Sequence, residues 1–234
     1  MADDSIARRK FLLGAGMAGT AVAAGLAEPA PAQVQTPPAP GSEPQPMLVL
    51  SATEAAFISA VADTMIPADA LSPSGTDCGI VTFADRQLAS AWGGGAKMYR
   101  SGPFRKGKPE HGYQLALAPR EFFAAGIAAT NAWTRKLHGK DFDRLAPTDR
   151  EAALKALEAG RAELGDLNGR EFFDALLNLV MEGFLADPIY GGNKDKAAWK
   201  MIGFPGLPAV YANLIDGYRH KRYVAEPQSI ADFS

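Results

Sequence analysis

The sequence predicts an all-α protein, and three observations support this fold class. Ser51 and Glu54 form a capping-box motif, which is typical of a helix N-terminus. In most of the chain after Glu54, apolar residues recur at spacings of three and four. This spacing places the apolar side chains on one face of a helix. No segment of convincing length alternates apolar and polar residues as a half-buried strand would. We therefore expect one compact multi-helix domain with long loops over residues 48–234.

The expected helices begin at capping motifs and end at proline or glycine. Residues 51–66 end before a proline, and residues 80–92 end at a run of glycines. Thr148 and Glu151 form a second capping-box motif. The helix that begins near Asn168 has the most regular apolar pattern, so we expect it to be the central core helix. Further helices are expected over residues 120–137, 194–201 and 209–223.

The first 32 residues have the features of an export signal. Arg8 and Arg9, followed by Phe11 and Leu12, form a twin-arginine motif. A mildly apolar segment rich in alanine and glycine follows, and an Ala-Pro-Ala cleavage site ends it. A membrane anchor and an ordinary N-terminal helix are the alternatives, and the many glycines weaken the first. We expect residues 1–32 to be a twin-arginine signal peptide, which directs the protein to the periplasm.

Residues 33–47 are rich in proline and almost devoid of apolar side chains. Such a segment cannot pack into a core, and it favours an extended conformation. We expect it to be a linker between the signal peptide and the domain. The twin-arginine route carries folded proteins, so a chain without a cofactor would use it most naturally together with a partner that has one.

Composition excludes several classes of protein. The net charge is −2 and the pI about 5.9, with no basic stripe, so nothing indicates a nucleic-acid-binding protein. The single cysteine, Cys78, rules out a disulfide within the chain and a cysteine-based metal site. Cys78 is either buried and inert or an intersubunit thiol that pairs with another chain. The three histidines are dispersed, and none follows a haem-attachment motif.

No catalytic constellation is evident. Glu182 and Asp187 are close in sequence, but nothing places a substrate between them. Gly191 and Gly192 could form an anion-binding nest, yet the phosphate-loop lysine is absent. We expect no catalytic, cofactor-binding or metal-binding residue in this chain. Residues 99–119 lack a helical period and carry a basic patch, so they are a second candidate contact surface or simply a solvated loop.

The least ordinary stretch is residues 187–206, with the sequence DPIYGGNKDKAAWKMIGFPG. Proline and glycine make two rigid turns, one on each side of a short helix that Asn193 can cap. On spacing alone this is a loop, helix and loop that closes a helical domain. The alternative is a contact surface with aromatic anchors.

The segments EGFLADPIYGGN and WKMIGFPG closely resemble the small subunit of bacterial gluconate 2-dehydrogenase, subunit 3. The resemblance implies a non-catalytic subunit that accompanies a large FAD flavoprotein and a multihaem cytochrome c. In such a complex the flavoprotein oxidises a sugar, sugar acid or alcohol and passes electrons to the cytochrome. The small subunit would engage the twin-arginine export machinery, stabilise the flavoprotein, and reach the membrane only through the complex. FAD and haem c are then expected in the partners and not in this chain.

The resemblance also makes residues 187–206 the expected interface, with the larger aromatic side chains as anchors because buried aromatics dominate interface energetics. Two other functions stay open: a free-standing periplasmic binding module, and a small periplasmic oxidoreductase that acts alone. The predicted interface residues are Asp187, Pro188, Tyr190, Gly191, Gly192, Asn193, Trp199, Phe204 and Pro205.

Overall fold

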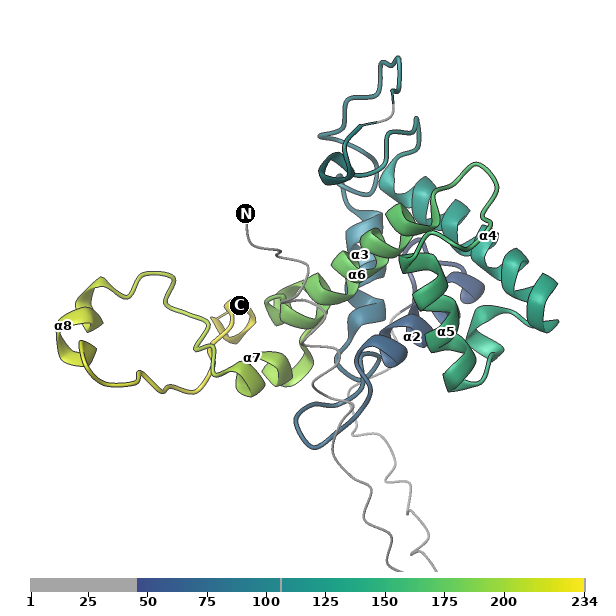
Figure 1. The fold of residues 1–234 in the computed structure, drawn as a ribbon. Helices are drawn as coiled ribbons and strands as arrows, with labels where there is room; N and C mark the ends of the chain where they lie inside the picture. Colours follow the sequence, from purple (N-terminus) through teal and green to yellow (C-terminus); the bar gives the residue numbers. More distant parts are fainter. Residues whose placement is uncertain (1–45, 106, 234) are drawn as a thin grey trace, which may run out of the picture. The chain divides into compact units, whose positions relative to one another are not determined.

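Helix α6 (Gly169–Leu185) lies at the centre of the helical body and packs against α2, α3, α4 and α5 (Figure 1). The computed structural model describes residues 46–105 and 107–233 of the protein. The side chain of Asn168 accepts hydrogen bonds from the first turn of α6, which confirms the predicted N-cap. The four surrounding helices are α2 (Ala52–Met65), α3 (Ile80–Ala89), α4 (Pro119–His138) and α5 (Pro147–Glu158).

The all-α prediction is confirmed for the described residues, which contain seven α-helices and no strand. The remaining two α-helices are short, α7 (Ala197–Ile202) and α8 (Ile215–Tyr218). Two isolated bridges, Leu164 with Leu167 and Gly206 with Gln228, are the extended pairings in this part of the chain. None of the described helices is long and apolar enough to cross a membrane.

A cluster of phenylalanine rings holds the helices together. Phe57 of α2 lies 4.9 Å from Phe142 and 6.4 Å from Phe172, measured between ring centroids. Phe122 of α4 meets the ring of Phe172 edge-on at 5.9 Å. All four rings are fully buried, and each contributes about 1.5–3 kcal/mol relative to an exposed ring. Gly126 of α4 is necessary here because a Cβ atom at this position would overlap the ring of Phe172.

One buried carboxylate fixes the chain just before α2. Asp85 of α3 accepts hydrogen bonds from the backbone N–H groups of Leu48, Val49 and Leu50, at 2.6, 3.0 and 2.9 Å. Burial raises the pKa of Asp85, but the three N–H donors and the charge of Arg86 outweigh it and lower the pKa below its usual value. Asp85 is therefore ionised at neutral pH and ties the start of the domain to α3.

One predicted helix end and one predicted capping box are wrong. α3 ends at Ala89, three residues before the expected end, and the side chain of Trp92 is exposed in the turn that follows. α5 has no capping box at Thr148 and Glu151, because the helix begins at Pro147 with Ala146 in the cap position. Proline favours the first helical position, so it moves the helix start ahead of the threonine.

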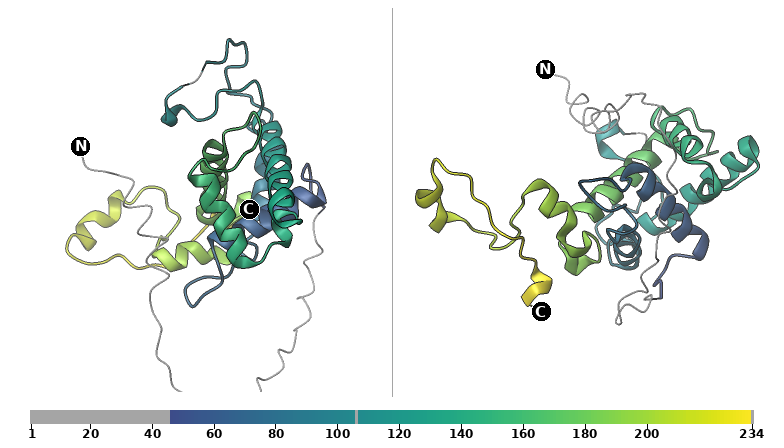
Figure 2. Two further views of the ribbon diagram at one scale, coloured as in Figure 1. Left: turned by 45° about the vertical axis from the view of Figure 1, so that its right-hand side comes forward. Right: turned by 90° about the horizontal axis from the view of Figure 1, so that it is seen from below.

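The prediction of one helix over residues 209–223 is also wrong. The structure has only a 3-10 turn, Ala212–Leu214, and the single turn of α8 (Figure 2). Ile215 and Val224 are exposed, so no core contact supports a longer helix. Isolated helices of this length are marginal in water without such packing.

We predict that Asp85→Ala lowers the free energy of unfolding by about 2–4 kcal/mol, because three backbone N–H groups, one of them buried and two partly buried, lose their charged acceptor. Urea denaturation of the purified protein measures this. Glu151→Ala is the control, since it removes only an exposed ion pair with Lys155 and should leave the midpoint nearly unchanged. Equal midpoints for the two variants would contradict the role of Asp85.

The same carboxylate predicts a pH dependence. A folded-state pKa below the unfolded value gives stability that is present above the unfolded pKa of about 3.9 and is lost as the pH falls through the folded pKa. The difference in unfolding free energy between the wild type and Asp85→Asn should therefore be constant near neutral pH and shrink below about pH 4. A difference that grew on acidification would refute this assignment.

Candidate functional site

The candidate site begins where α6 ends. Asp187 accepts a hydrogen bond from the N–H of Ile189 at 3.0 Å, which starts the 3-10 helix Pro188–Tyr190. Its second carboxylate oxygen accepts from the N–H of Ile230 at 2.9 Å. Both oxygens thus serve the backbone, and Asp187 joins the end of α6 to the last residues of the chain.

The two glycines that follow let the backbone approach other backbone. A Cβ atom on Gly192 would overlap the carbonyl oxygen of Gly183 in α6, so only glycine fits there. Gly191 has a φ of 98°, and its carbonyl oxygen lies where a Cβ atom of Gly79 would be. These two glycines thus bring the backbone against the chain's own α6 and against the start of α3.

Asn193 holds the next turn from inside. Its side chain is fully buried, donates to the carbonyl of Ala186 at 3.0 Å and accepts from the N–H of Ala198 at 2.9 Å. The predicted helix over residues 194–201 is divided into a 3-10 turn and α7, because Asp195 and Lys196 both have a φ of 57°. Left-handed backbone at such residues costs about 1–3 kcal/mol each, so the surrounding contacts must impose it.

The aromatic residues of the segment differ in exposure. Trp199 is 5% exposed, and its indole N–H donates to the carbonyl of Leu185 at 2.8 Å. Its ring meets the ring of Phe204 edge-on, with 5.1 Å between centroids. Phe204 and Tyr190 are 43% and 50% exposed. Trp199 therefore packs within the chain and positions Phe204, while Phe204 and Tyr190 face outward.

Other exposed apolar side chains lie close in sequence to Tyr190 and Phe204. They come from the end of α6, from the 3-10 helix after it, and from α7 and the turn that follows. Exposed apolar residues that adjoin one another are typical of protein contact surfaces. The group consists of Leu185, Ile189, Tyr190, Ile202 and Phe204.

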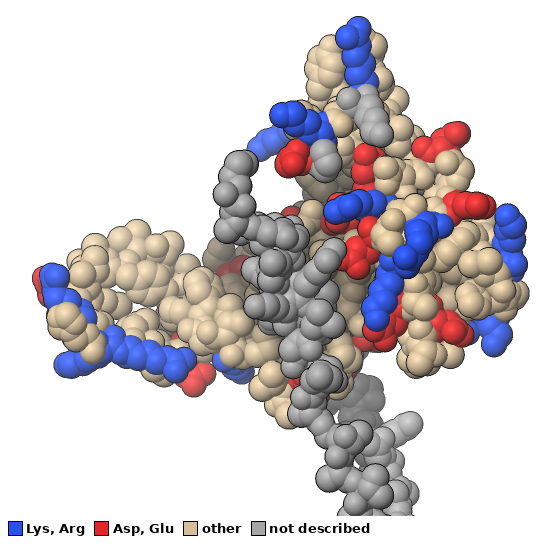
Figure 3. All heavy atoms as spheres, in the orientation of Figure 1, with Lys and Arg blue, Asp and Glu red and all other residues tan. Residues whose placement is uncertain are grey.

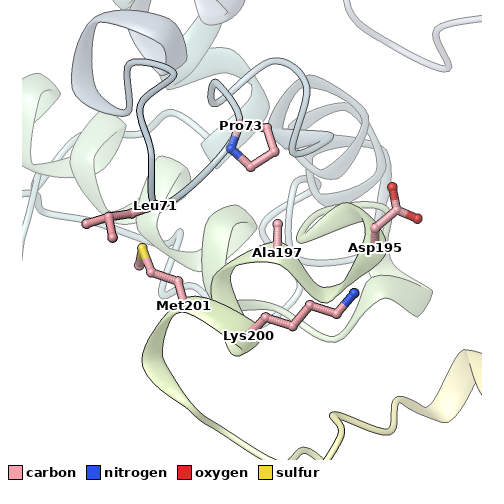
Figure 4. A pocket seen from close by; sticks show the side chains of 6 residues that line it. All are labelled: Leu71, Pro73, Asp195, Ala197, Lys200 and Met201. Atoms are coloured by element: carbon pink, nitrogen blue, oxygen red, sulfur yellow. The ribbon is translucent and has the colours of Figure 1, made fainter.

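A shallow recess of about 380 Å³ lies between the loop before α3 and α7. Figure 4 shows Leu71 and Pro73 on the loop side and four residues of the 194–201 region opposite them, among them Asp195, Lys200 and Met201. Within residues 46–105 and 107–233, no group of three histidine, cysteine, aspartate or glutamate side chains could hold a metal ion.

Glu182 and Asp187, which are close in sequence, do not act as a pair of carboxylates. Burial raises the pKa of Glu182, which lies on α6. Asp187 is engaged by the backbone N–H groups of Ile189 and Ile230. No convergent acid and base is formed by these two residues.

Cys78 is buried beneath the same loop. Its thiol lies 3.7 Å from the carbonyl of Pro73, and its own carbonyl accepts from the N–H of Lys194 at 3.0 Å. Burial, together with the charges of Asp77 and Asp63, raises the pKa of the thiol. Pairing of Cys78 with another chain stays a prediction, and it would require this loop to open.

The second candidate surface, residues 99–119, is anchored to the core at one end. Tyr113 stacks on Phe122 with 3.9 Å between ring centroids, and its hydroxyl donates to the carbonyl of Leu117 at 3.2 Å. Burial and the charge of Glu121 raise the pKa of Tyr113 to about 12. Toward the other end, Tyr99 and Phe104 are exposed. The predicted export motif, Arg8, Arg9, Phe11 and Leu12, lies outside the described residues.

Residues 228–232 also contact the site, and no sequence pattern predicts this. The ammonium group of Lys196 binds both carboxylate oxygens of Asp232, at 3.0 and 2.7 Å. The hydrogen bond from Lys196 lowers the pKa of Asp232. Gln228 exchanges backbone hydrogen bonds with Pro205 and Leu207. These contacts join residues far apart in sequence, so no local pattern reveals them.

Comparison with known proteins places this arrangement in a family. Residues 52–206 match the family model described as Gluconate 2-dehydrogenase subunit 3. The chain belongs to this family. The match runs from α2 through α7 and ends at Gly206, so it includes both the helical core and the candidate site. Searches of curated proteins and of solved structures found no match.

We predict that Gly192→Ala destabilises the protein, because the added methyl group would overlap the carbonyl of Gly183 and neither backbone can yield. The melting temperature should fall by several degrees. Gly217→Ala is the matched control, since nothing lies within 4 Å of a Cβ atom there. Equal melting temperatures would show that the two backbones are not packed this closely.

We predict that Cys78 reacts slowly with maleimide in the folded protein and rapidly after denaturation, because burial protects the thiol and disfavours the thiolate. Mass spectrometry of the labelled protein, taken with and without urea, measures both rates. Rapid labelling of the folded chain would contradict the buried position. Failure to label the denatured, unreduced complex would reveal a disulfide to a partner.

Proposed function

We propose that this protein is the non-catalytic small subunit of a membrane-associated, FAD-dependent dehydrogenase complex. The large flavoprotein of that complex would oxidise a sugar, sugar acid or alcohol. Electrons would pass from its FAD to a multihaem cytochrome c, and this cytochrome would hold the complex at the membrane. The chain itself would carry no cofactor.

Membership in the gluconate 2-dehydrogenase subunit 3 family is the observation that carries the proposal. The family description names a subunit, and a subunit needs a surface for its partner. Tyr190 and Phe204 supply exposed aromatic rings inside the matched region, next to other exposed apolar side chains. Aromatic residues of this kind are enriched at the centres of protein interfaces.

The interface in this proposal is residues 187–206. Tyr190 and Phe204 make direct contacts with the large subunit. Asp187, Asn193 and Trp199 act from inside, because their polar atoms bind the backbone of the chain itself and thereby fix the outward-facing residues. Pro188, Gly191, Gly192 and Pro205 shape the turns that connect them.

Export and stabilisation complete the proposal. The twin-arginine motif at Arg8 and Arg9 would engage the export machinery, and the flavoprotein would travel to the periplasm bound to this chain. The large subunit would then depend on the small one for both transport and stability.

We predict that the tagged chain, expressed with its signal peptide and isolated from periplasm and membrane under mild conditions, brings down a flavoprotein and a haem protein. An absorption spectrum with flavin and haem bands, followed by mass identification, measures this. Recovery of a lone colourless chain would refute the subunit function and favour a free-standing binding module. A chromophore bound to the chain alone would favour an independent oxidoreductase.

We predict that Phe204→Ala reduces the recovered complex about tenfold and lowers the melting temperature of the isolated chain less than Trp199→Ala does, because Phe204 is 43% exposed and Trp199 only 5%. Trp199→Ala should lower both complex recovery and melting temperature, since Trp199 is buried and packs on Phe204. Leu137→Ala, an exposed residue at the end of α4, is the control. Unchanged complex recovery for both aromatic variants would exclude residues 187–206 as the interface.

A further inference from the structure

Residues 208–227 form a loop that leaves and returns at one place. Gly206 and Gln228 form an isolated bridge at its neck. The N–H of Leu207 donates to the carbonyl of Gln228 at 2.8 Å, and the N–H of Gln228 donates to the carbonyl of Pro205 at 3.0 Å. Figures 1 and 2 show these residues, coloured yellow, as an open loop beyond α7. The neck thus attaches the loop directly to the candidate interface.

The loop exposes apolar side chains and has little core of its own. Its internal packing consists mainly of three tyrosines, with ring centroids 5.9 Å apart for Tyr211 and Tyr223 and 4.9 Å apart for Tyr218 and Tyr223. The hydroxyl of Tyr211 donates to the carbonyl of Gly206 at 2.8 Å, which fixes the first part of the loop on the neck. The exposed apolar residues are Val210, Ile215, Tyr218 and Val224.

Basic side chains give the surface of this loop a preference for acidic groups. Arg219, Lys221 and Arg222 are exposed on the loop, and Figure 3 shows blue side chains along the corresponding part of the molecule. Arg219 pairs with Asp216 at 2.9 Å. The part of the chain that the structure describes supplies no carboxylate to Lys221 or Arg222 within ion-pair distance. A partner surface with carboxylates would satisfy these two cations.

The basic part of the loop is continuous with the candidate interface. A Cβ atom on Gly203 would lie 3.2 Å from a guanidinium nitrogen of Arg222. The exposed ring of Phe204 follows Gly203 directly in the chain. Arg222 and Phe204 therefore belong to neighbouring parts of one surface.

We propose that residues 208–227 are a second docking element for the large subunit, with Tyr218 and Arg222 in direct contact with it. The contact surface on the large subunit combines an apolar depression with carboxylates. This inference rests on the proposed function and extends the interface beyond Gly206, where the family match ends. The loop therefore adds contacts that the family model does not describe.

The composition of the loop favours a protein, and not a membrane, as its binding partner. Tyrosine and arginine are the residue types that dominate binding energy at protein interfaces, and the loop presents both. A membrane surface is bound by a longer amphipathic helix, whereas α8 (Ile215–Tyr218) is one turn. The loop has no continuous apolar helix face that could lie in a bilayer.

The test measures binding of the isolated large flavoprotein subunit to the immobilised mature chain, at low and at high salt. Tyr218→Ala and Arg222→Glu should each weaken binding about tenfold. The melting temperature of Arg222→Glu should be unchanged because this side chain is exposed, whereas Tyr218→Ala also removes a ring contact with Tyr223 within the loop. The loss from Arg222→Glu should be smaller at high salt. Arg170→Glu is the matched control, since Arg170 is exposed at the opposite end of α6, about 22 Å from the end that leads to the site.

The outcomes separate this inference from the function on which it rests. If the wild-type chain binds the large subunit and both variants bind equally well, the docking loop is refuted and the subunit function stands. If the wild-type chain does not bind the large subunit, both proposals fail. The docking loop would also be overturned if Tyr218→Ala left binding of the large subunit unchanged and instead abolished binding to anionic vesicles or dimerisation of the chain.

Discussion

The contact between Gly183 and Gly192 leaves no room for a side chain, and the course of the chain after Gly192 depends on it. With the backbone held against α6 at this point, Asn193 can reach both Ala186 and Ala198. α7 then starts at a fixed distance from the end of α6. Trp199 consequently meets the carbonyl of Leu185, one of the carbonyls that a helix end leaves without an intrahelical partner.

In this arrangement one group of residues fixes the backbone beneath the surface, and another group exposes its side chains on the surface. Asp187, Asn193 and Trp199 direct their polar atoms to the backbone, and the last two are buried. Tyr190 and Phe204 leave their rings exposed. A buried residue in such a site affects binding through the fold, whereas an exposed ring affects it through contact. Melting temperature measured beside affinity distinguishes the two roles.

The parts of the fold that the sequence predicted are those encoded locally. The box of Ser51 and Glu54 and the cap at Asn168 form as expected, because each involves residues two or three positions apart. The regular apolar rows of α6 likewise required only a helical period. The box at Thr148 failed because the preceding proline set the helix start.

Long-range contacts account for most of what the sequence did not reveal. Asp85 binds residues 48–50, and Lys196 binds Asp232 36 positions away. The expected helix over residues 209–223 had an apolar pattern but found no core to pack against. In the candidate site, composition indicated residues 187–206, and their role as an interface stays a prediction. The sequence does not reveal that Trp199 is buried while Phe204 is partly exposed.

The neck at Gly206 and Gln228 has a consequence for how the protein can change over evolution. Because the two ends of the loop already lie together, residues between them can be replaced, lengthened or shortened without moving α6 or α7. The entropic cost of closing a loop grows only slowly with its length. A chain built in this way can acquire a new partner by exchanging one closed segment, while the helical body and its aromatic core are inherited unchanged.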